Sequence, residues 1–158
     1  MEHIWAPWRI QYIQSVKTEG CILCEKPKQD NDSANLILFR GDNNFIIMNL
    51  YPYNPGHLMV VPYRHIANPD DMNKDERYEH IDLINKSVKA LRKILNPDGF
   101  NLGMNIGQVA GAGISDHIHT HIVPRWQGDN NFMTTVSDTR VVPQALAESY
   151  KNLKPQFK

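Results

Sequence analysis

The sequence has no long apolar segment and no excess of charge of either sign. No run approaches the roughly 20 apolar residues that span a bilayer, and the N-terminus lacks the apolar core of a signal peptide. Lys plus Arg and Asp plus Glu both total 17, so no net field attracts nucleic acid or an anionic membrane. We therefore expect neither partner, and any bound phosphate must be held by local hydrogen-bond donors.

Cysteine is also scarce, and the only two form the pair Cys21-x-x-Cys24. Two cysteines are too few for a disulfide scaffold, which predicts a reducing cytoplasm and a metal-binding or redox pair. A C-x-x-C pair is half of a zinc site, and histidines can supply the other ligands. Spacing alone does not choose among the seven histidines, and an inert pair stays an alternative.

The chain of 158 residues is 41% apolar and 22% charged, which is typical of one globular domain with a real core. We expect a single domain over residues 1–158, with an N-terminal arm (1–20) and a C-terminal extension (126–158). Trp5 and Trp8 flank Pro7 in the arm, which favours docking of the arm on the body or on a second subunit.

The pattern of apolar residues predicts an α+β fold. Residues 36–40 and 45–49 form a predicted hairpin, and residues 57–62 and 100–105 are further predicted strands. One long helix begins after Asn73, where Glu76 completes a capping box, and it ends before Pro97. Its apolar stripe is predicted to contain Ile81, Ile84, Val88, Leu91 and Leu95. A short helix is predicted over residues 144–153, so helices pack on one side of a largely antiparallel sheet.

Three histidines, His117, His119 and His121, alternate with Ile118 and Thr120 within residues 116–125. Alternation with β-branched residues predicts a strand, on which residues two apart share a face. All three imidazoles are therefore expected to point the same way. Imidazole titrates near neutrality and can act as nucleophile, acid, base or metal ligand, so this stretch is the predicted centre of function.

A glycine-rich bend precedes these histidines and contains Gly107, Gly111, Gly113 and Ser115. Glycine adopts positive φ and lets backbone amides approach a ligand closely, and successive amides form a concavity that binds anions. The bend alone is a weak signal. Its position directly before the histidines favours a phosphate site to which the Ser115 hydroxyl can add a donor.

The run His117-x-His119-x-His121-Ile122-Val123 resembles the signature of the histidine triad superfamily of nucleotide hydrolases and transferases. A second block, from Asn49 through Pro55-Gly56-His57 to His65, is similar to the other landmark of that family. Residues 5–9 and 123–129 resemble the branch that contains bacterial diadenosine tetraphosphate phosphorylases. The resemblance covers nearly the whole chain and implies a histidine-triad fold, in which one long helix and a short C-terminal helix pack on an antiparallel sheet.

The resemblance also implies a mechanism. His119 would attack the α-phosphorus of a dinucleoside polyphosphate and form a nucleotidyl-histidine, which water or phosphate then cleaves. The carbonyl near His117 would hold one ring nitrogen of His119 as N–H, and His121 would bind the charge that grows on the phosphoryl oxygens. The implied catalytic residues are therefore His117, His119 and His121.

The resemblance further implies which residues hold the ligands. The expected substrate-binding residues are Asn49 at the ribose, Ile47 and Phe39 at the base, and His57, Asn105, Gly111, Gly113, Ser115 and Trp126. The expected ligands of a structural zinc are Cys21, Cys24, His65 and His117. A homodimer that binds a nucleotide substrate is the implied assembly.

Two departures from the family pattern leave alternatives open. Thr120 stands where the signature usually has an apolar residue, and Gly113 occupies roughly the place of a glutamine that many hydrolase members carry. The second departure leaves the acceptor of the second step undecided. The alternatives are a nucleoside phosphoramidate hydrolase, a zinc enzyme with the three histidines as ligands, and a nucleotide-binding module without turnover.

Overall fold

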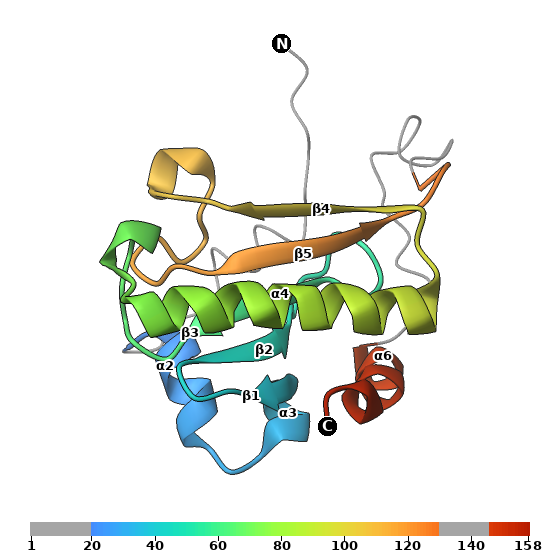
Figure 1. Ribbon diagram of the computed structural model, residues 1–158, viewed down its shortest axis with the longest axis horizontal. Helices are drawn as coiled ribbons and strands as arrows, with labels where there is room; N and C mark the ends of the chain where they lie inside the picture. The colour runs from blue at the N-terminus through green and yellow to red at the C-terminus, as the bar shows by residue number, and fades with distance from the viewer. Residues whose placement is uncertain (1–19, 130–145) are drawn as a thin grey trace.

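A computed structural model describes residues 20–129 and 146–158 (Figure 1). Residues 1–19 of the predicted arm and residues 130–145 of the predicted extension lie outside the described residues. The centre is an antiparallel sheet of five strands in the order β1-β2-β3-β5-β4. The strands are β1 (Ile37–Arg40), β2 (Asn44–Met48), β3 (Leu58–Pro62), β4 (Gly99–Met104) and β5 (Thr120–Arg125). The predicted α+β class is confirmed.

The long helix α4 crosses one face of this sheet (Figure 1). The described helices are α2 (Ile22–Glu25), α3 (Asp32–Asn35), α4 (Lys74–Leu95) and α6 (Leu146–Leu153). The C-terminal helix α6 packs beside α4, and its Leu153 joins the core between α4 and the sheet. No described helix has the length and apolar character of a membrane span.

The alternation of side chains along the strands gives the sheet two buried faces. The face toward α4 buries one cluster, which includes Leu38, Ile46, Met48, Leu58, Val60, Leu91 and Ile122. The opposite face buries a second cluster of Leu23, Ile37, Phe45, Ile47 and Val61, with Leu23 supplied by α2. Each strand of the hairpin therefore contributes to both cores, which explains why β2 is buried along its whole length.

The predicted capping box of α4 is present, because Asn73 accepts from the Glu76 amide and Glu76 accepts from the Asn73 amide. The predicted apolar stripe is wrong at one position, since Ile81 is 57% exposed. The buried face instead runs along His80, Leu83, Ile84, Ser87, Ala90 and Leu91. A polar residue, His80, occupies the place on this face that the apolar pattern assigned to Ile81.

Strand β5 begins later than predicted, at Thr120 rather than at residue 116. It pairs with β3 on one side and with β4 on the other, with Thr120 opposite Val60 and Met104. Only His121 of the three histidines therefore lies within the strand. His117 and His119 lie in the segment that leads from the glycine bend into the sheet.

Candidate functional site

Three histidine rings, His57, His119 and His121, gather on the sheet face opposite α4. His121 shares that face of β5 because its neighbours Thr120 and Ile122 point toward α4. The ring centroids of His119 and His121 are 4.8 Å apart, and those of His57 and His121 are 5.0 Å apart. His119 is 6% exposed and His57 is 1% exposed, so the rings are largely shielded from water.

The hydrogen bonds of these rings fix their neutral tautomers. A carbonyl can only accept, so His119 must carry its proton on Nδ1, which lies 2.9 Å from the His117 carbonyl oxygen. Neutral His119 therefore carries its ring lone pair on Nε2, which has no hydrogen-bond partner among the described residues. A neutral ring with a free lone pair beside other polar groups can attack an electrophile.

His57 and His121 take the opposite tautomer. The backbone N–H of Tyr53 donates to His57 Nδ1 at 3.1 Å, so neutral His57 carries its proton on Nε2. That Nε2–H donates to His121 Nδ1 at 2.9 Å, which leaves the proton of neutral His121 on Nε2. His119 thus offers a lone pair where the adjacent His121 offers a donor, which suits attack on a phosphoryl group whose oxygens gain charge.

Burial keeps this group of rings uncharged at neutral pH. Burial lowers the pKa of His119 below the ordinary histidine value, against the raising effect of the hydrogen bond to His117. Burial, with repulsion from His119, lowers the pKa of His121 to about 4. Burial, with repulsion from His121 and His119, lowers the pKa of His57 to about 3. The tautomers above are therefore the populated ones near pH 7.

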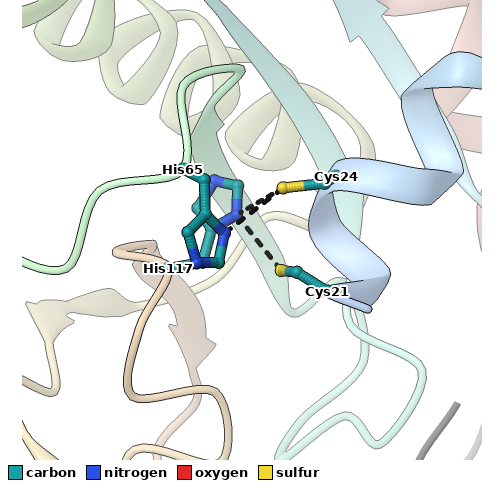
Figure 2. A group of neighbouring side chains, drawn as sticks. All are labelled: Cys21, Cys24, His65 and His117. Atoms are coloured by element: carbon teal, nitrogen blue, oxygen red, sulfur yellow. Dashed lines mark hydrogen bonds between the residues drawn. The ribbon is translucent and has the colours of Figure 1, made fainter. Parts of the chain in front are cut away.

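The ring of His117 belongs to a second cluster, which differs from the prediction that all three imidazoles share one face of a strand. Its Nδ1 lies 3.3 Å from Cys21 Sγ and 3.4 Å from Cys24 Sγ. His65 Nδ1 lies 3.3 Å from Cys24 Sγ. Figure 2 shows Cys21, directly before α2, and Cys24, within α2, facing the two histidine rings. The alternation that placed His117 with His119 fails because β5 starts only at Thr120.

This Cys/His cluster has the donor set of a tetrahedral zinc site, and three of its sulfur–nitrogen distances are 3.3–3.4 Å. Its four ligand atoms lie within 4.8 Å of one another. Tetrahedral zinc with Cys and His ligands separates neighbouring ligand atoms by roughly 3.3–3.8 Å. His117 donates Nε2–H to the Pro62 carbonyl at 2.8 Å, which leaves its Nδ1 lone pair aimed at the cysteines. His65 Nε2 lies 3.5 Å from an Asp116 carboxylate oxygen, the kind of outer partner that orients a metal-bound histidine.

A groove of ≈ 290 Å³ opens beside His121 along strands β4 and β5. Asn105, one of the expected substrate-binding residues, lines this groove. The groove is also lined by residues that the sequence did not single out: Tyr53, Asn54, Asn101, Leu102, Gly103, Met104, Val123 and Arg125. The β4–β5 register brings the strand residues of this lining together, with Gly103 opposite His121 and Asn101 opposite Val123. That register cannot be read from the sequence of either strand alone. Asn54 joins these strand residues from the loop before β3, where its Nδ2 donates to the Pro124 carbonyl at 2.8 Å.

Two other predicted substrate residues lie near the histidines. The side-chain Nδ2 of Asn49 lies 3.4 Å from His57 Nδ1, and its Oδ1 accepts from the Tyr51 amide at 3.0 Å. Ile47 points to the same face of the sheet but is 1% exposed within the second core cluster. Asn49 is therefore half-buried beside His57, whereas Ile47 is enclosed in the second core cluster.

Phe39 lies on the other side of the sheet, so the prediction that it and Ile47 wall one pocket is wrong. Phe39 packs against the core under α4, and the Lys86 ammonium sits 3.9 Å from its ring centroid. The register shifts between Ile37 and Phe39, which have partners Ile47 and Ile46. This irregularity in β1 is a feature that the apolar pattern did not reveal.

The glycine bend is exposed, and two of its glycines adopt the positive φ that its composition predicted. Gly107 has φ 80° and Gly111 has φ 85°, at the two ends of a 3-10 turn over Gln108–Ala110. Gly113 does not share this conformation. Gly111, Gly113 and Ser115 are exposed, whereas Trp126 is half-buried just after β5 and outside the lining of the groove.

Comparison with known proteins places the chain in a family. A HIT domain model matches residues 30–128. An AP-4-A phosphorylase of Mycobacterium tuberculosis is 35% identical over 166 aligned residues, which cover 99% of this chain and 85% of that protein. An asymmetrical bis(5'-nucleosyl)-tetraphosphatase of Schizosaccharomyces pombe is 28% identical over 93 residues, or 59% of this chain and 50% of that protein.

A solved structure shows the same fold. The Zn-bound histidine triad family protein from Mycobacterium smegmatis superimposes with a TM-score of 0.69 at 26% identity, covering 87% of this chain and 92% of that one. The domain match spans more than half of the chain, and the mycobacterial relative matches nearly all of it. The resemblance drawn from the two histidine blocks is confirmed, and the chain belongs to the HIT, or histidine triad, family.

Proposed function

We propose that this protein cleaves dinucleoside polyphosphates at the α-phosphorus through a nucleotidyl-His119 intermediate. The observation that carries the proposal is the hydrogen bond from His119 Nδ1–H to the His117 carbonyl, beside the opposite tautomer of His121. This pair sets a nucleophilic lone pair next to a hydrogen-bond donor. The similarity to an AP-4-A phosphorylase and to a tetraphosphatase supports the choice of substrate class.

In the first step, His119 Nε2 forms a bond to the α-phosphorus while the bond from phosphorus to the bridging oxygen breaks. The nucleoside polyphosphate leaves with that electron pair, and the positive charge gained by the ring is stabilised through Nδ1–H by the His117 carbonyl. The Nε2–H of His121 and amides of the glycine bend bind the charged phosphoryl oxygens. In the second step, an oxygen of phosphate or water forms a bond to phosphorus while the bond from phosphorus to His119 Nε2 breaks, which restores the lone pair of His119. When the attacking group is water, its proton is released to solvent.

The nucleoside side of the site is assigned to residues around the histidines. Asn49 lies next to His57 and is proposed to bind the ribose, with Ile47 beneath the base. Asn105, Gly111, Gly113 and Ser115 are proposed to bind phosphoryl oxygens, and Trp126 remains a proposed substrate contact beyond the groove. A nucleoside phosphoramidate presents the same α-phosphorus and is the alternative substrate class.

The hydrogen-bond partners of the ring nitrogens do not favour a catalytic metal held by His117, His119 and His121 together. His119 Nδ1 is engaged by the His117 carbonyl, His121 Nδ1 by His57, and His117 Nδ1 faces the cysteines. Within residues 20–129 and 146–158, the four-residue Cys/His cluster is the group whose ligand atoms converge. We infer a structural zinc held by Cys21, Cys24, His65 and His117, in a reducing cytoplasm that keeps both thiols free.

We also infer a homodimer, because β4 ends the described sheet. An edge strand presents unpaired N–H and C=O groups, and Leu102 on β4 is 52% exposed. A second copy that pairs along β4 would cover this edge and close over the groove beside His121. Light scattering on the purified protein measures the assembly, and Leu102→Lys is expected to yield a monomer.

The experiment that tests the proposed activity is incubation with diadenosine tetraphosphate, with and without inorganic phosphate. ADP plus ATP formed only with phosphate identifies phosphorolysis, whereas AMP plus ATP formed in water alone identifies hydrolysis. Nucleotide binding with neither product, and with no protein–nucleotide adduct after acid quench, would overturn the enzymatic proposal in favour of a binding module.

A further inference from the structure

A buried polar network links helix α4 to the strand that carries His121. His80 is 2% exposed and faces the sheet from α4. Its Nδ1 lies 2.8 Å from Asn44 Oδ1, and its Nε2 lies 2.7 Å from Thr120 Oγ1. Asn44 begins β2 and Thr120 begins β5, so one imidazole joins three elements. No step of the mechanism above uses this residue.

The direction of each hydrogen bond in this network follows from its ends. Asn44 Nδ2 donates to the Glu76 carbonyl at 3.1 Å and to a Glu79 carboxylate oxygen at 3.0 Å, both of which can only accept. Asn44 Oδ1 must then accept from His80 Nδ1–H. Burial lowers the pKa of His80 to about 4, so the ring is neutral at pH 7 and its Nε2 accepts from the Thr120 hydroxyl.

The far end of the network is also fixed. The Glu79 carboxylate accepts from the backbone amides of Asp42, Asn43 and Asn44, each at 2.7 Å. The start of β2 is thereby held against α4. A fully satisfied buried polar network is rigid, because each lost hydrogen bond leaves a group unpaired in a medium of low dielectric constant.

Thr120 is the residue at which the chain joins the sheet. His119, just before it, has no partner in β3 or β4, whereas Thr120 is paired with Val60 and Met104. The two rings that perform the proposed chemistry are therefore the immediate neighbours of the residue that His80 holds. The hydroxyl that pairs with His80 Nε2 is supplied by Thr120.

From this juxtaposition we propose that His80 is a positioning residue, which fixes the reacting pair His119 and His121 through its hydrogen bond to Thr120. The inference rests on the proposed function, since positioning has a catalytic meaning only if His119 attacks phosphorus. It extends that function because His80, on α4 and outside the site, bonds Thr120, which lies between His119 and His121. The network would set where the His119 lone pair points relative to the His121 donor.

The test compares Thr120→Val, which keeps the shape but removes the hydroxyl, with Thr120→Ser, which keeps the hydroxyl. His80→Leu removes the acceptor, and the double variant Thr120→Val with His80→Leu completes a double-mutant cycle. The matched control is Ser87→Ala on the same buried face of α4, because among the described residues the Ser87 hydroxyl bonds only the Leu83 carbonyl of its own helix. Turnover of diadenosine tetraphosphate and the ¹⁵N signals of the histidine rings are measured for each variant.

The expected result is a fall in kcat of about tenfold to a hundredfold in Thr120→Val and in His80→Leu, with KM nearly unchanged. The double variant is expected to be no slower than the slower single variant, and Thr120→Ser to recover most of the activity. In Thr120→Val the Nδ1–H tautomer of His119 should lose population. Ser87→Ala is expected to lower the melting temperature without changing kcat.

The proposal is overturned if folded Thr120→Val and His80→Leu keep the kcat of the wild type, or if Ser87→Ala loses as much kcat as they do. An His80 ring protonated on Nε2 in the wild type also overturns it. If the wild type shows no turnover, the proposed function is wrong. The positioning role is then judged by whether the Nδ1–H tautomer of His119 loses population in Thr120→Val.

Discussion

The ring of His119 donates Nδ1–H to the backbone carbonyl of His117 at 2.9 Å, and the ring of His117 faces two cysteines. One residue therefore serves two sites, with its carbonyl in the reacting group and its imidazole in the Cys/His cluster. The cluster holds the segment directly before His119, because the His117 ring faces Cys21 and Cys24. A zinc ion bound by these residues would help to fix the orientation of His119 without touching a substrate.

Replacing the nucleophile tests this arrangement most directly. His119→Asn is expected to lower kcat by at least roughly 10³-fold with little change in KM, because a covalent nucleophile acts mainly in the transition state. Steady-state kinetics with diadenosine tetraphosphate measure this, and acid quench with labelled substrate should trap an adduct only in the wild type. Turnover of His119→Asn close to the wild-type rate would exclude the covalent scheme.

The tautomer of His121 depends on His57, which makes a second prediction. His57→Phe removes the donor to His121 Nδ1 while keeping a ring of similar size. We expect kcat to fall by roughly tenfold to a hundredfold, since the His121 proton is no longer held on Nε2. The ¹⁵N spectrum of His121 should then show both neutral tautomers. An unchanged spectrum would contradict the dependence of the His121 tautomer on His57.

The Cys/His cluster, with the proposed zinc, is expected to contribute mainly to the stability of the fold. Metal analysis should find about one zinc per chain, and both chelation and Cys21→Ser should lower the melting temperature by several degrees or more. The loss of kcat in protein that remains folded should be much smaller than in His119→Asn. A melting temperature that neither treatment changes would count against a structural metal.

Gly56, directly before His57, is expected to tolerate no side chain. Its φ is +75°, and a Cβ there would lie 2.5 Å from Leu95 Cδ1 and 2.9 Å from Leu91 Cδ2. Gly56→Ala should therefore cost about 1–3 kcal/mol of unfolding free energy from strain and overpacking. Gly99→Ala is the control, since nothing lies within 4 Å of its Cβ position. Urea denaturation measures both, and equal losses would contradict the packing argument.

The buried His80 predicts that stability falls in mild acid. Burial holds the pKa of His80 at about 4 in the folded chain, whereas the unfolded chain binds a proton near pH 6.5. Stability is therefore full above pH 6.5, is lost as pH falls toward 4, and has lost about 3 kcal/mol below both values. Urea denaturation at pH 7.5 and pH 5 should show a smaller loss for His80→Leu than for the wild type. Equal losses in the two proteins would rule out this contribution of His80.

The local elements could be predicted because their signals lie close together in the sequence. The hairpin of β1 and β2 follows from two apolar runs around a turn, and the start of α4 follows from Asn73 and Glu76. The exposure of Ile81 escaped the pattern, because a helix of period 3.6 fixes an apolar stripe but not which flank meets the sheet. His80 is buried on that flank because its ring nitrogens bond Asn44 on β2 and Thr120 on β5.

The sequence by itself determined the family, the order of the strands along the chain and the histidines to which we assign the proposed chemistry. Only the tertiary structure decided that His117 turns to the cysteines, that Phe39 lies under α4 and that Asn101 and Gly103 line the groove beside His121. The physical reason is the distance along the sequence over which each kind of interaction acts. Periodicity and capping act over a few residues, whereas register across the sheet and the pairing of buried polar groups join residues that are tens of positions apart.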